Sequence, residues 1–106
     1  MHNLHFKYWP KDLPKNLEIP DQGIYKNLKN SSLKFPKKKC IIFENQEITY
    51  EQLDNYVNKL SFFLTDNLKI KKGDRILLDL QSSPHFIISY YAILKSGCVV
   101  VPISPM

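Results

Sequence analysis

The sequence predicts an α/β fold, with an N-terminal helix and a β-hairpin followed by a βαβ parallel-strand unit. We expect this to be part of a larger N-terminal domain. Residues 75–80 and 98–101 form two near-continuous apolar runs, as in parallel strands buried on both faces. An apolar helical segment lies between them, and strand, helix, strand at this spacing indicates a right-handed crossover. Upstream, two β-rich runs flank a short polar turn, which is typical of a hairpin.

Residues 1–20 are predicted to be an extended arm, separate from a structured region at 21–106. The prolines Pro10, Pro14 and Pro20 favour extended backbone over a regular element. Phe6, Tyr8 and Trp9 are interpreted as anchors that pack on the rest of the protein. A peptide that binds a partner is the alternative.

Residues 21–35 are predicted to form a short helix. Asp21 is the expected N-cap, and Pro36 ends the helix. The spacing places four residues on one face: Ile24, Leu28, Ser32 and Phe35. Ser32 on this apolar face indicates a close contact that only a small side chain fits.

The hairpin is predicted from residues 40–43 and 47–49 around a turn at 44–46. Its second strand runs directly into a helix, where Thr49 and Gln52 have the spacing of a capping box. An apolar stripe then follows at helical spacing: Leu53, Tyr56, Val57, Leu60, Phe63 and Leu64.

The βαβ unit begins after a turn at 71–74, where Gly73 is expected to supply a positive φ. Ser83 is the predicted cap of the crossover helix, with Pro84 at its first position. That helix is apolar nearly all round, which favours burial, and Gly97 terminates it. The second strand, at 98–101, is expected to stop at Pro102.

Asp79 is the polar exception within the first parallel strand. A strand-end or edge position, paired to Arg75 or to a backbone amide, explains it about as well as a functional role.

Composition narrows the class of protein. An apolar fraction of 43% and a charged fraction of 24% are those of an ordinary soluble protein, and 106 residues allow one domain at most. The net charge of +5 is spread along the chain with a single arginine, Arg75, so we interpret it as a solvated surface and expect no nucleic-acid partner.

The longest apolar stretch, 86–94, is too short to span a bilayer. With no signal-peptide pattern, we expect a cytoplasmic protein without an integral membrane segment.

No catalytic, cofactor-binding or metal-ligating residue is predicted. The glycines are too far apart for a phosphate loop, and His2 with His5 has no nearby carboxylate or thiolate to complete a metal site. His85 is expected at the surface. Cys40 and Cys98 lie outside any zinc or redox spacing and are interpreted as small buried thiols in a reducing compartment.

Four local patterns occur in one order and together carry a family resemblance. They are 48–53 (ITYEQL), 72–75 (KGDR), 83–86 (SPHF) and 94–102 (LKSGCVVVP). This succession resembles the N-terminal region of the adenylate-forming superfamily, which includes acyl-CoA synthetases, firefly-type luciferases and the adenylation domains of peptide synthetases. The resemblance covers residues 21–105. The sequence departs from it at Ser82, where many members have Asn, and at His85, where an acidic residue is common.

The resemblance implies a two-step ligase. Such an enzyme uses ATP and Mg²⁺ to join a carboxylate to AMP, and then transfers the acyl group to the thiol of coenzyme A. The Tyr-Trp-Pro arm and the Val-Val-Val-Pro segment look most like a fatty acyl-CoA ligase. The family's catalytic segments lie downstream of the matched patterns, so the chain is expected to be inactive alone, with the turn at 102–105 nearest to ligand.

The expected partners are therefore the rest of the parent polypeptide and, because open sheet edges can pair, a second copy of the chain. A stand-alone interaction or dimerisation module with a borrowed fold is the main alternative. A small nucleic-acid binder is the least favoured.

Overall fold

The computed structural model describes residues 3–104 and confirms the α/β class. Its helices are η1 (Leu4–Tyr8, a 3₁₀ helix), α1 (Ile24–Lys34), α2 (Tyr50–Phe62), η2 (Phe63–Asn67, a π-helical turn) and α3 (Pro84–Lys95). Its strands are β1 (Lys39–Phe43), β2 (Gln46–Thr49), β3 (Arg75–Asp79) and β4 (Val99–Ile103). β1 pairs with β2 antiparallel, and β3 pairs with β4 parallel.

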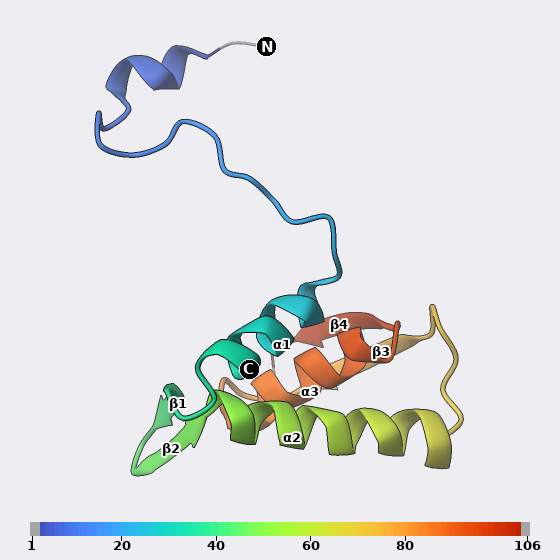
Figure 1. Cartoon of the computed structure of the whole chain (residues 1–106). Coiled ribbons are helices and arrows are strands. Elements are labelled where there is room, and N and C mark those ends of the chain that lie inside the picture. The colour runs from blue at the N-terminus through green and yellow to red at the C-terminus, as the bar shows by residue number, and fades with distance from the viewer. Residues whose placement is uncertain (1–2, 105–106) are drawn as a thin grey trace.

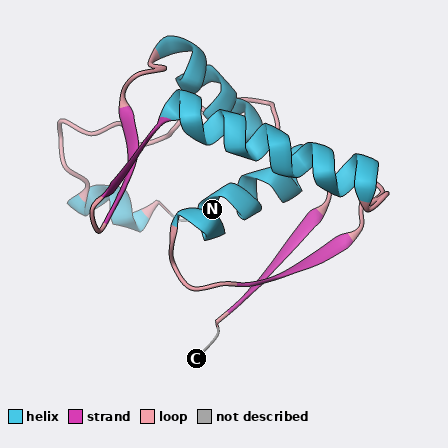
Figure 2. Ribbon diagram, turned by 90° about the horizontal axis from the view of Figure 1, so that it is seen from below, coloured by secondary structure: helices cyan, strands magenta, loops and turns pink. Residues whose placement is uncertain are grey.

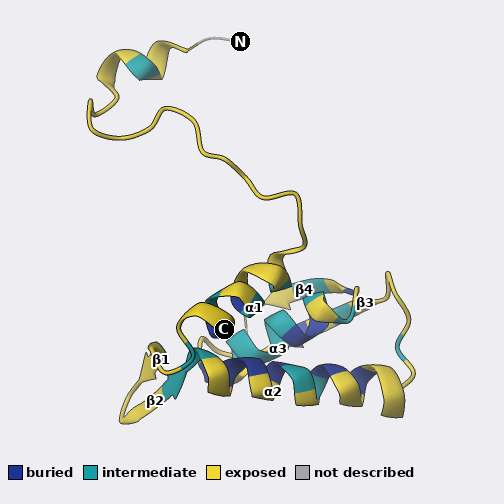
Figure 3. Ribbon diagram, in the orientation of Figure 1, coloured by how far each residue is buried: buried dark blue, intermediate teal, exposed yellow. Residues whose placement is uncertain are grey.

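The helix α3 is the middle layer of the body. It packs on α2 on one side and on the β3–β4 sheet on the other, while α1 lies across both helices (Figures 1 and 2). The buried positions of the three helices face one another (Figure 3). The core cluster is Leu28, Ile41, Leu53, Val57, Leu64, Ala92, Ile93 and Cys98.

The start of α1 differs from the prediction. The N-cap is Gly23, and Asp21 lies two residues too early for its carboxylate to satisfy the first helical amides. Leu28 and Ser32 are buried as predicted, but Ile24 is 53% exposed. The packed face instead passes through the half-buried Tyr25.

The hairpin and the cap of α2 are confirmed. Phe43 pairs with Gln46, so the turn consists of Glu44 and Asn45 and is one residue shorter than expected. The Thr49 hydroxyl accepts a hydrogen bond from the Gln52 amide at 3.2 Å, and the Gln52 side chain accepts one from the Thr49 amide at 2.9 Å. Two otherwise unpaired amide groups at the start of α2 are thereby satisfied.

Replacing Thr49 with alanine should destabilise the chain by about 1 kcal/mol, because the Gln52 amide loses its side-chain acceptor. The measurement is urea denaturation followed by far-ultraviolet circular dichroism. Thr49→Ser is the matched control, since it keeps the hydroxyl and should retain most of the stability. Equal losses in the two variants would contradict a capping role.

The apolar stripe of α2 is only partly buried. Leu53, Val57 and Leu64 belong to the core, whereas Tyr56 is 46% exposed and Phe63 is 45% exposed. The backbone changes to π-helical geometry at Phe63, which shifts the last turn relative to the stripe. Two residues of the predicted apolar stripe therefore lie largely outside the core.

The parallel strands are confirmed, but their burial on both faces is not. Leu78 faces α3 and is 5% exposed, while its neighbour Leu77 points to the opposite face and is 63% exposed. The sheet has two strands within residues 3–104, and α3 covers only one of its faces. Asp79 is the last residue of β3, as the strand-end interpretation expects, and no ion pair joins it to Arg75 in the described part of the chain.

Strand β4 continues through Pro102 to Ile103, which corrects the predicted stop at Pro102. The Val99 amide donates to the Asp74 carbonyl at 2.8 Å, toward β3. Amides alternate in direction along a strand, so the nitrogen of Pro102 faces away from β3, where no ladder bond is lost.

Both ends of the crossover helix match the sequence. The Ser83 hydroxyl accepts from the Phe86 amide with Pro84 in the first turn, and Gly97 follows the last turn with φ of 76°. Gly73 has φ of 89°, as predicted for the preceding turn, and its amide donates to the Gly97 carbonyl at 2.9 Å. This bond holds the start of β3 beside the start of β4.

The N-terminal arm stands away from the body (Figure 1). The chain's radius of gyration is 17.1 Å, against about 13 Å for a compact domain of this length. The arm contains the helical turn η1, which the prediction of an entirely extended segment missed. None of the residues of η1 is buried, so the body described here does not cover them, and the interpretation that the aromatic side chains pack on the rest of the protein stays a prediction.

Within residues 3–104, no helix is both long and apolar enough to cross a membrane. Cys40 and Cys98 are free thiols, of which Cys98 is buried and Cys40 is half-buried.

Candidate functional site

A hollow of about 440 Å³ lies at the carboxyl ends of the two parallel strands. It is lined by Leu80, Gln81, Ser82, Phe86, Pro102, Ile103 and Ser104. The turn predicted to lie nearest to ligand thus forms one wall, except for Pro105, which is outside the described residues. Open α/β sheets bind ligands at this edge because the loops leaving neighbouring strands converge there.

The position of one wall of this hollow depends on the hydrogen bonds of Ser83, the N-cap of α3. The Ser83 hydroxyl accepts from the Phe86 amide at 3.4 Å and donates to the Gln81 carbonyl at 3.0 Å. These two bonds fix the sharp change from β3 to α3, and they place the Phe86 ring opposite the end of β4.

The chemistry of the hollow is limited to shape and neutral hydrogen bonding. Its apolar side chains are interrupted by one amide and two hydroxyl groups, and no lining residue is titratable. Acid–base catalysis needs an ionisable group within hydrogen-bond reach, and Mg²⁺ prefers carboxylate oxygens. The hollow therefore suits part of a binding surface rather than a reaction centre.

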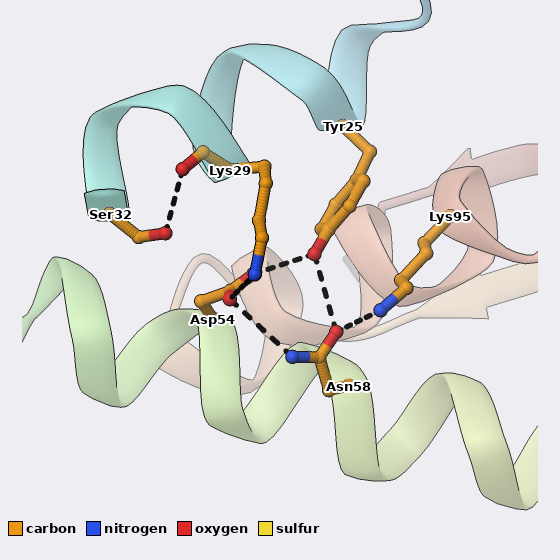
Figure 4. Close-up of polar contacts among 6 residues, drawn as sticks. All are labelled: Tyr25, Lys29, Ser32, Asp54, Asn58 and Lys95. Atoms are coloured by element: carbon orange, nitrogen blue, oxygen red, sulfur yellow. Dashed lines mark hydrogen bonds and ion pairs between the residues drawn. The ribbon is translucent and has the colours of Figure 1, made fainter. Parts of the chain in front are cut away.

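A second candidate is a polar cluster where α1, α2 and α3 meet (Figure 4). The Asp54 carboxylate, 5% exposed, accepts from the Tyr25 hydroxyl at 2.7 Å, Lys29 at 3.2 Å and the Asn58 amide at 3.4 Å. Asn58 in turn accepts a hydrogen bond from Lys95 at the end of α3. The cluster links all three helices through one buried carboxylate.

The Tyr25 hydroxyl has two acceptors but one proton. It lies 2.7 Å from the Asp54 carboxylate and 3.2 Å from the Asn58 carbonyl oxygen, so the shorter, charge-assisted contact takes the proton. Burial raises the pKa of this hydroxyl, and the hydrogen bond to Asp54 and its negative charge raise it further. Tyr25 therefore stays a neutral donor, which suits a structural role and not a catalytic base.

The cluster was not predicted from the sequence, although a signal was present. Asp54 lies between Leu53 and Val57 on the inward side of α2, where an unpaired charge would be costly. The i, i+4 spacing of Asp54 and Asn58 places both on that side.

The cysteines do not have the surroundings of reactive thiols. Burial raises the pKa of the Cys98 thiol, which donates to the Lys71 carbonyl at 3.4 Å. Burial also raises the pKa of Cys40, and a hydrogen bond with Tyr50 offsets this in part. Thiolate nucleophiles require the opposite shift.

The histidines gather into no site in the described residues. His85 is exposed, as predicted, and His5 packs against Phe6 with ring centroids 4.3 Å apart. His2 lies outside the described residues, so the expectation for His2 with His5 stays a prediction. No group of three metal-ligating side chains occurs within residues 3–104.

Comparison with known protein families shows which family the chain belongs to. Residues 28–106 match the family model described as AMP-binding enzyme, so the chain belongs to the AMP-binding enzyme family. The predicted resemblance to adenylate-forming enzymes is confirmed.

The relatives include both fatty-acid–CoA ligases and peptide synthetases. The chain is 34% identical to a long-chain-fatty-acid–CoA ligase of Bacillus subtilis over 98 residues, or 92% of this chain and 17% of that protein. It is 32% identical to gramicidin S synthase 2 of Brevibacillus brevis over 88 residues, or 83% of this chain and 2% of that protein. The chain thus spans less than a fifth of the length of these relatives.

Solved structures show the same fold. The N-terminal subdomain of NpsA from Klebsiella oxytoca superimposes with a TM-score of 0.75 at 28% identity, over 79% of this chain and 22% of that chain. A fatty acid AMP ligase from Legionella pneumophila superimposes with a TM-score of 0.71 at 29% identity, over 78% of this chain and 15% of that one.

Proposed function

We propose that the chain is the N-terminal part of an ATP-dependent, AMP-forming acyl-CoA ligase that acts on fatty acids in the cytoplasm. In this proposal the parent enzyme activates a carboxylate as its acyl-adenylate and transfers the acyl group to coenzyme A. ATP, Mg²⁺ and coenzyme A are its cofactors.

The extent of similarity is the observation that supports an acyl-CoA ligase over a peptide synthetase. The match to the Bacillus subtilis ligase covers 92% of this chain at 34% identity. The match to gramicidin S synthase 2 covers 83% of this chain at 32% identity. Of these two matches, the longer and more similar one is thus to the fatty acyl-CoA ligase.

The residues that line the hollow at the ends of β3 and β4 do not by themselves fit ATP or Mg²⁺. The hollow at the ends of β3 and β4 offers neither carboxylates for a cation nor basic groups for phosphates. No reaction step is therefore assigned to it. Its contribution is a shaped, mostly apolar wall held rigid by the Ser83 cap.

The test is an exchange assay on the complete polypeptide that contains this chain. It should catalyse ATP–pyrophosphate exchange with fatty acids and form acyl-CoA, whereas residues 1–106 alone should show neither activity. Exchange with amino acids only would favour a peptide synthetase. Adenylate formation by residues 1–106 alone would overturn the assignment of catalysis to the rest of the polypeptide.

A second candidate, an interaction or dimerisation module, is favoured by one observation. The outer face of the β3–β4 sheet exposes Leu77, Val99 and Ile103 at 63%, 48% and 41%. A two-stranded parallel sheet with an uncovered apolar face offers both an edge and a face to a second copy. A stop codon directly after Met106 in the source gene would favour this candidate over the ligase.

A further inference from the structure

The arm contains a preformed aromatic turn, which we define as residues 5–14. The Phe6 and Trp9 rings pack edge to face with centroids 5.7 Å apart. The Trp9 indole donates to the Pro14 carbonyl at 3.0 Å, and the Leu13 amide donates to the Pro10 carbonyl at 3.3 Å. Local contacts therefore give this turn a defined shape without help from the body.

The aromatic turn and the segment after it leave several large apolar side chains exposed. Tyr8 is 81% exposed and Leu13 is 53% exposed, and the following Leu17 and Ile19 are 80% and 87% exposed. The arm that carries them stands away from the body (Figure 1). Exposed apolar side chains gathered in one short segment favour an interaction surface over a solvated linker.

The charge of the arm favours an apolar protein partner over a highly charged one. Three lysines, Lys7, Lys11 and Lys15, are nearly balanced by Asp12 and Glu18. Lys15 is also engaged within the arm, since its ammonium lies 5.5 Å from the centroid of the Phe6 ring. An anionic surface would instead select a dense basic run.

The prolines reduce the cost of docking. Pro10, Pro14 and Pro20 fix φ along the arm, so fewer backbone conformations are lost when it binds. An ordered segment binds with a smaller entropy cost than a flexible one. The arm is thus suited to lie along a larger protein surface.

The length of the relatives bears on where that surface lies. The family model matches residues 28–106, beyond the arm, whereas the match to the Bacillus subtilis ligase covers 92% of this chain. This chain spans 17% of that ligase, so most of the ligase is protein that the body described here does not contain.

We propose that the aromatic turn docks on the part of the acyl-CoA ligase polypeptide that follows residue 106, with Trp9 as its anchor. This inference rests on the proposed function, because it requires the remainder of the ligase as the partner. A rigid indole that buries its ring on docking is the usual kind of anchor in protein interfaces.

Limited trypsin digestion tests the docking. Cleavage at the Lys15–Asn16 bond should be at least about tenfold slower in the complete polypeptide than in residues 1–106, since protease reaches only the undocked population. Trp9→Ala in the complete polypeptide should restore the rate seen for residues 1–106. Leu33→Ala is the matched control: it removes a 69% exposed side chain from α1 and should leave the protection unchanged.

The outcomes separate the alternatives. Equal cleavage in the two proteins would overturn the proposal. Protection that appears only as protein concentration rises would assign the turn to a second copy, and protection only with phosphatidylcholine–phosphatidylglycerol vesicles would assign it to a membrane; either result overturns docking within the chain. An active ligase with an unprotected arm refutes the docking alone, and a protected arm without ATP–pyrophosphate exchange refutes the ligase alone.

Discussion

Replacing Leu53 with alanine is expected to lower the free energy of unfolding by about 2–5 kcal/mol. Leu53 is 1% exposed in the first half of α2, and it belongs to the core cluster shared by α1, α2 and α3. Removing its branched end loses transfer free energy and leaves a cavity that three fixed helices cannot close. Domains of this size have only about 5–15 kcal/mol of stability in total.

Urea denaturation of residues 1–106 measures this effect. Phe62→Ala is the matched control: it also shortens a large side chain of α2, but Phe62 is 64% exposed. The control should stay within about 0.5 kcal/mol of the parent chain, as surface substitutions usually do. Similar losses for the two variants would mean that α2 does not pack as described.

The size of this expected loss reflects how little else holds the body together. The β3–β4 sheet is covered on one face only, and Leu77 on the other face remains 63% exposed. A domain normally buries both faces of a parallel sheet. The stability of the chain therefore rests mainly on the three-helix contact, of which Leu53 is a central part.

Local signals in the sequence were sufficient for the start of α2 and for both ends of α3. The Thr49–Gln52 capping box, the Ser83 cap and the glycine at 97 each depend on neighbours within a few residues. The geometry of these caps depends on short-range hydrogen bonds and on φ. The identities of adjacent residues are therefore enough to predict the caps.

Features set by distant neighbours could not be predicted in the same way. The apolar run of β3 indicates burial on both faces, but burial also needs a covering layer, and the run carries no information on whether one is present. Pro102 is compatible with a strand only because its nitrogen faces away from β3. Sequence pattern alone does not give that orientation.

The same difference between adjacent and distant residues applies to the candidate site. The 102–105 turn was placed near ligand because parallel strands open at their carboxyl ends, and residues 102–104 do line the hollow there. The Asp54 cluster was missed because its members come from three helices. Tyr25 and Asp54 are 29 residues apart, and no local pattern connects them.

Replacing Asp54 with alanine is expected to cost about 1.5–3 kcal/mol, the range for a buried hydrogen bond to a charged group. The Tyr25 hydroxyl would keep only the longer contact to Asn58, and the Lys29 ammonium, whose side chain is 40% exposed, would return to water. Asp54→Asn should cost less, because its carbonyl oxygen can still accept from Tyr25. Urea denaturation of both variants gives the order.

A double-mutant cycle with Tyr25→Phe distinguishes a specific bond from general damage to α2. If the hydroxyl and the carboxylate act together, Asp54→Ala should cost less in the Tyr25→Phe background, by about 0.5 kcal/mol or more. The exposed pair Lys39–Glu47, at 2.9 Å, provides the control: Glu47→Gln should change stability by less than about 1 kcal/mol. Additive losses for Tyr25 and Asp54 would show that the carboxylate does not hold α1 through this tyrosine. A coupled pair would instead make Asp54 the buried polar contact that joins α1, and with it the arm, to the rest of the fold.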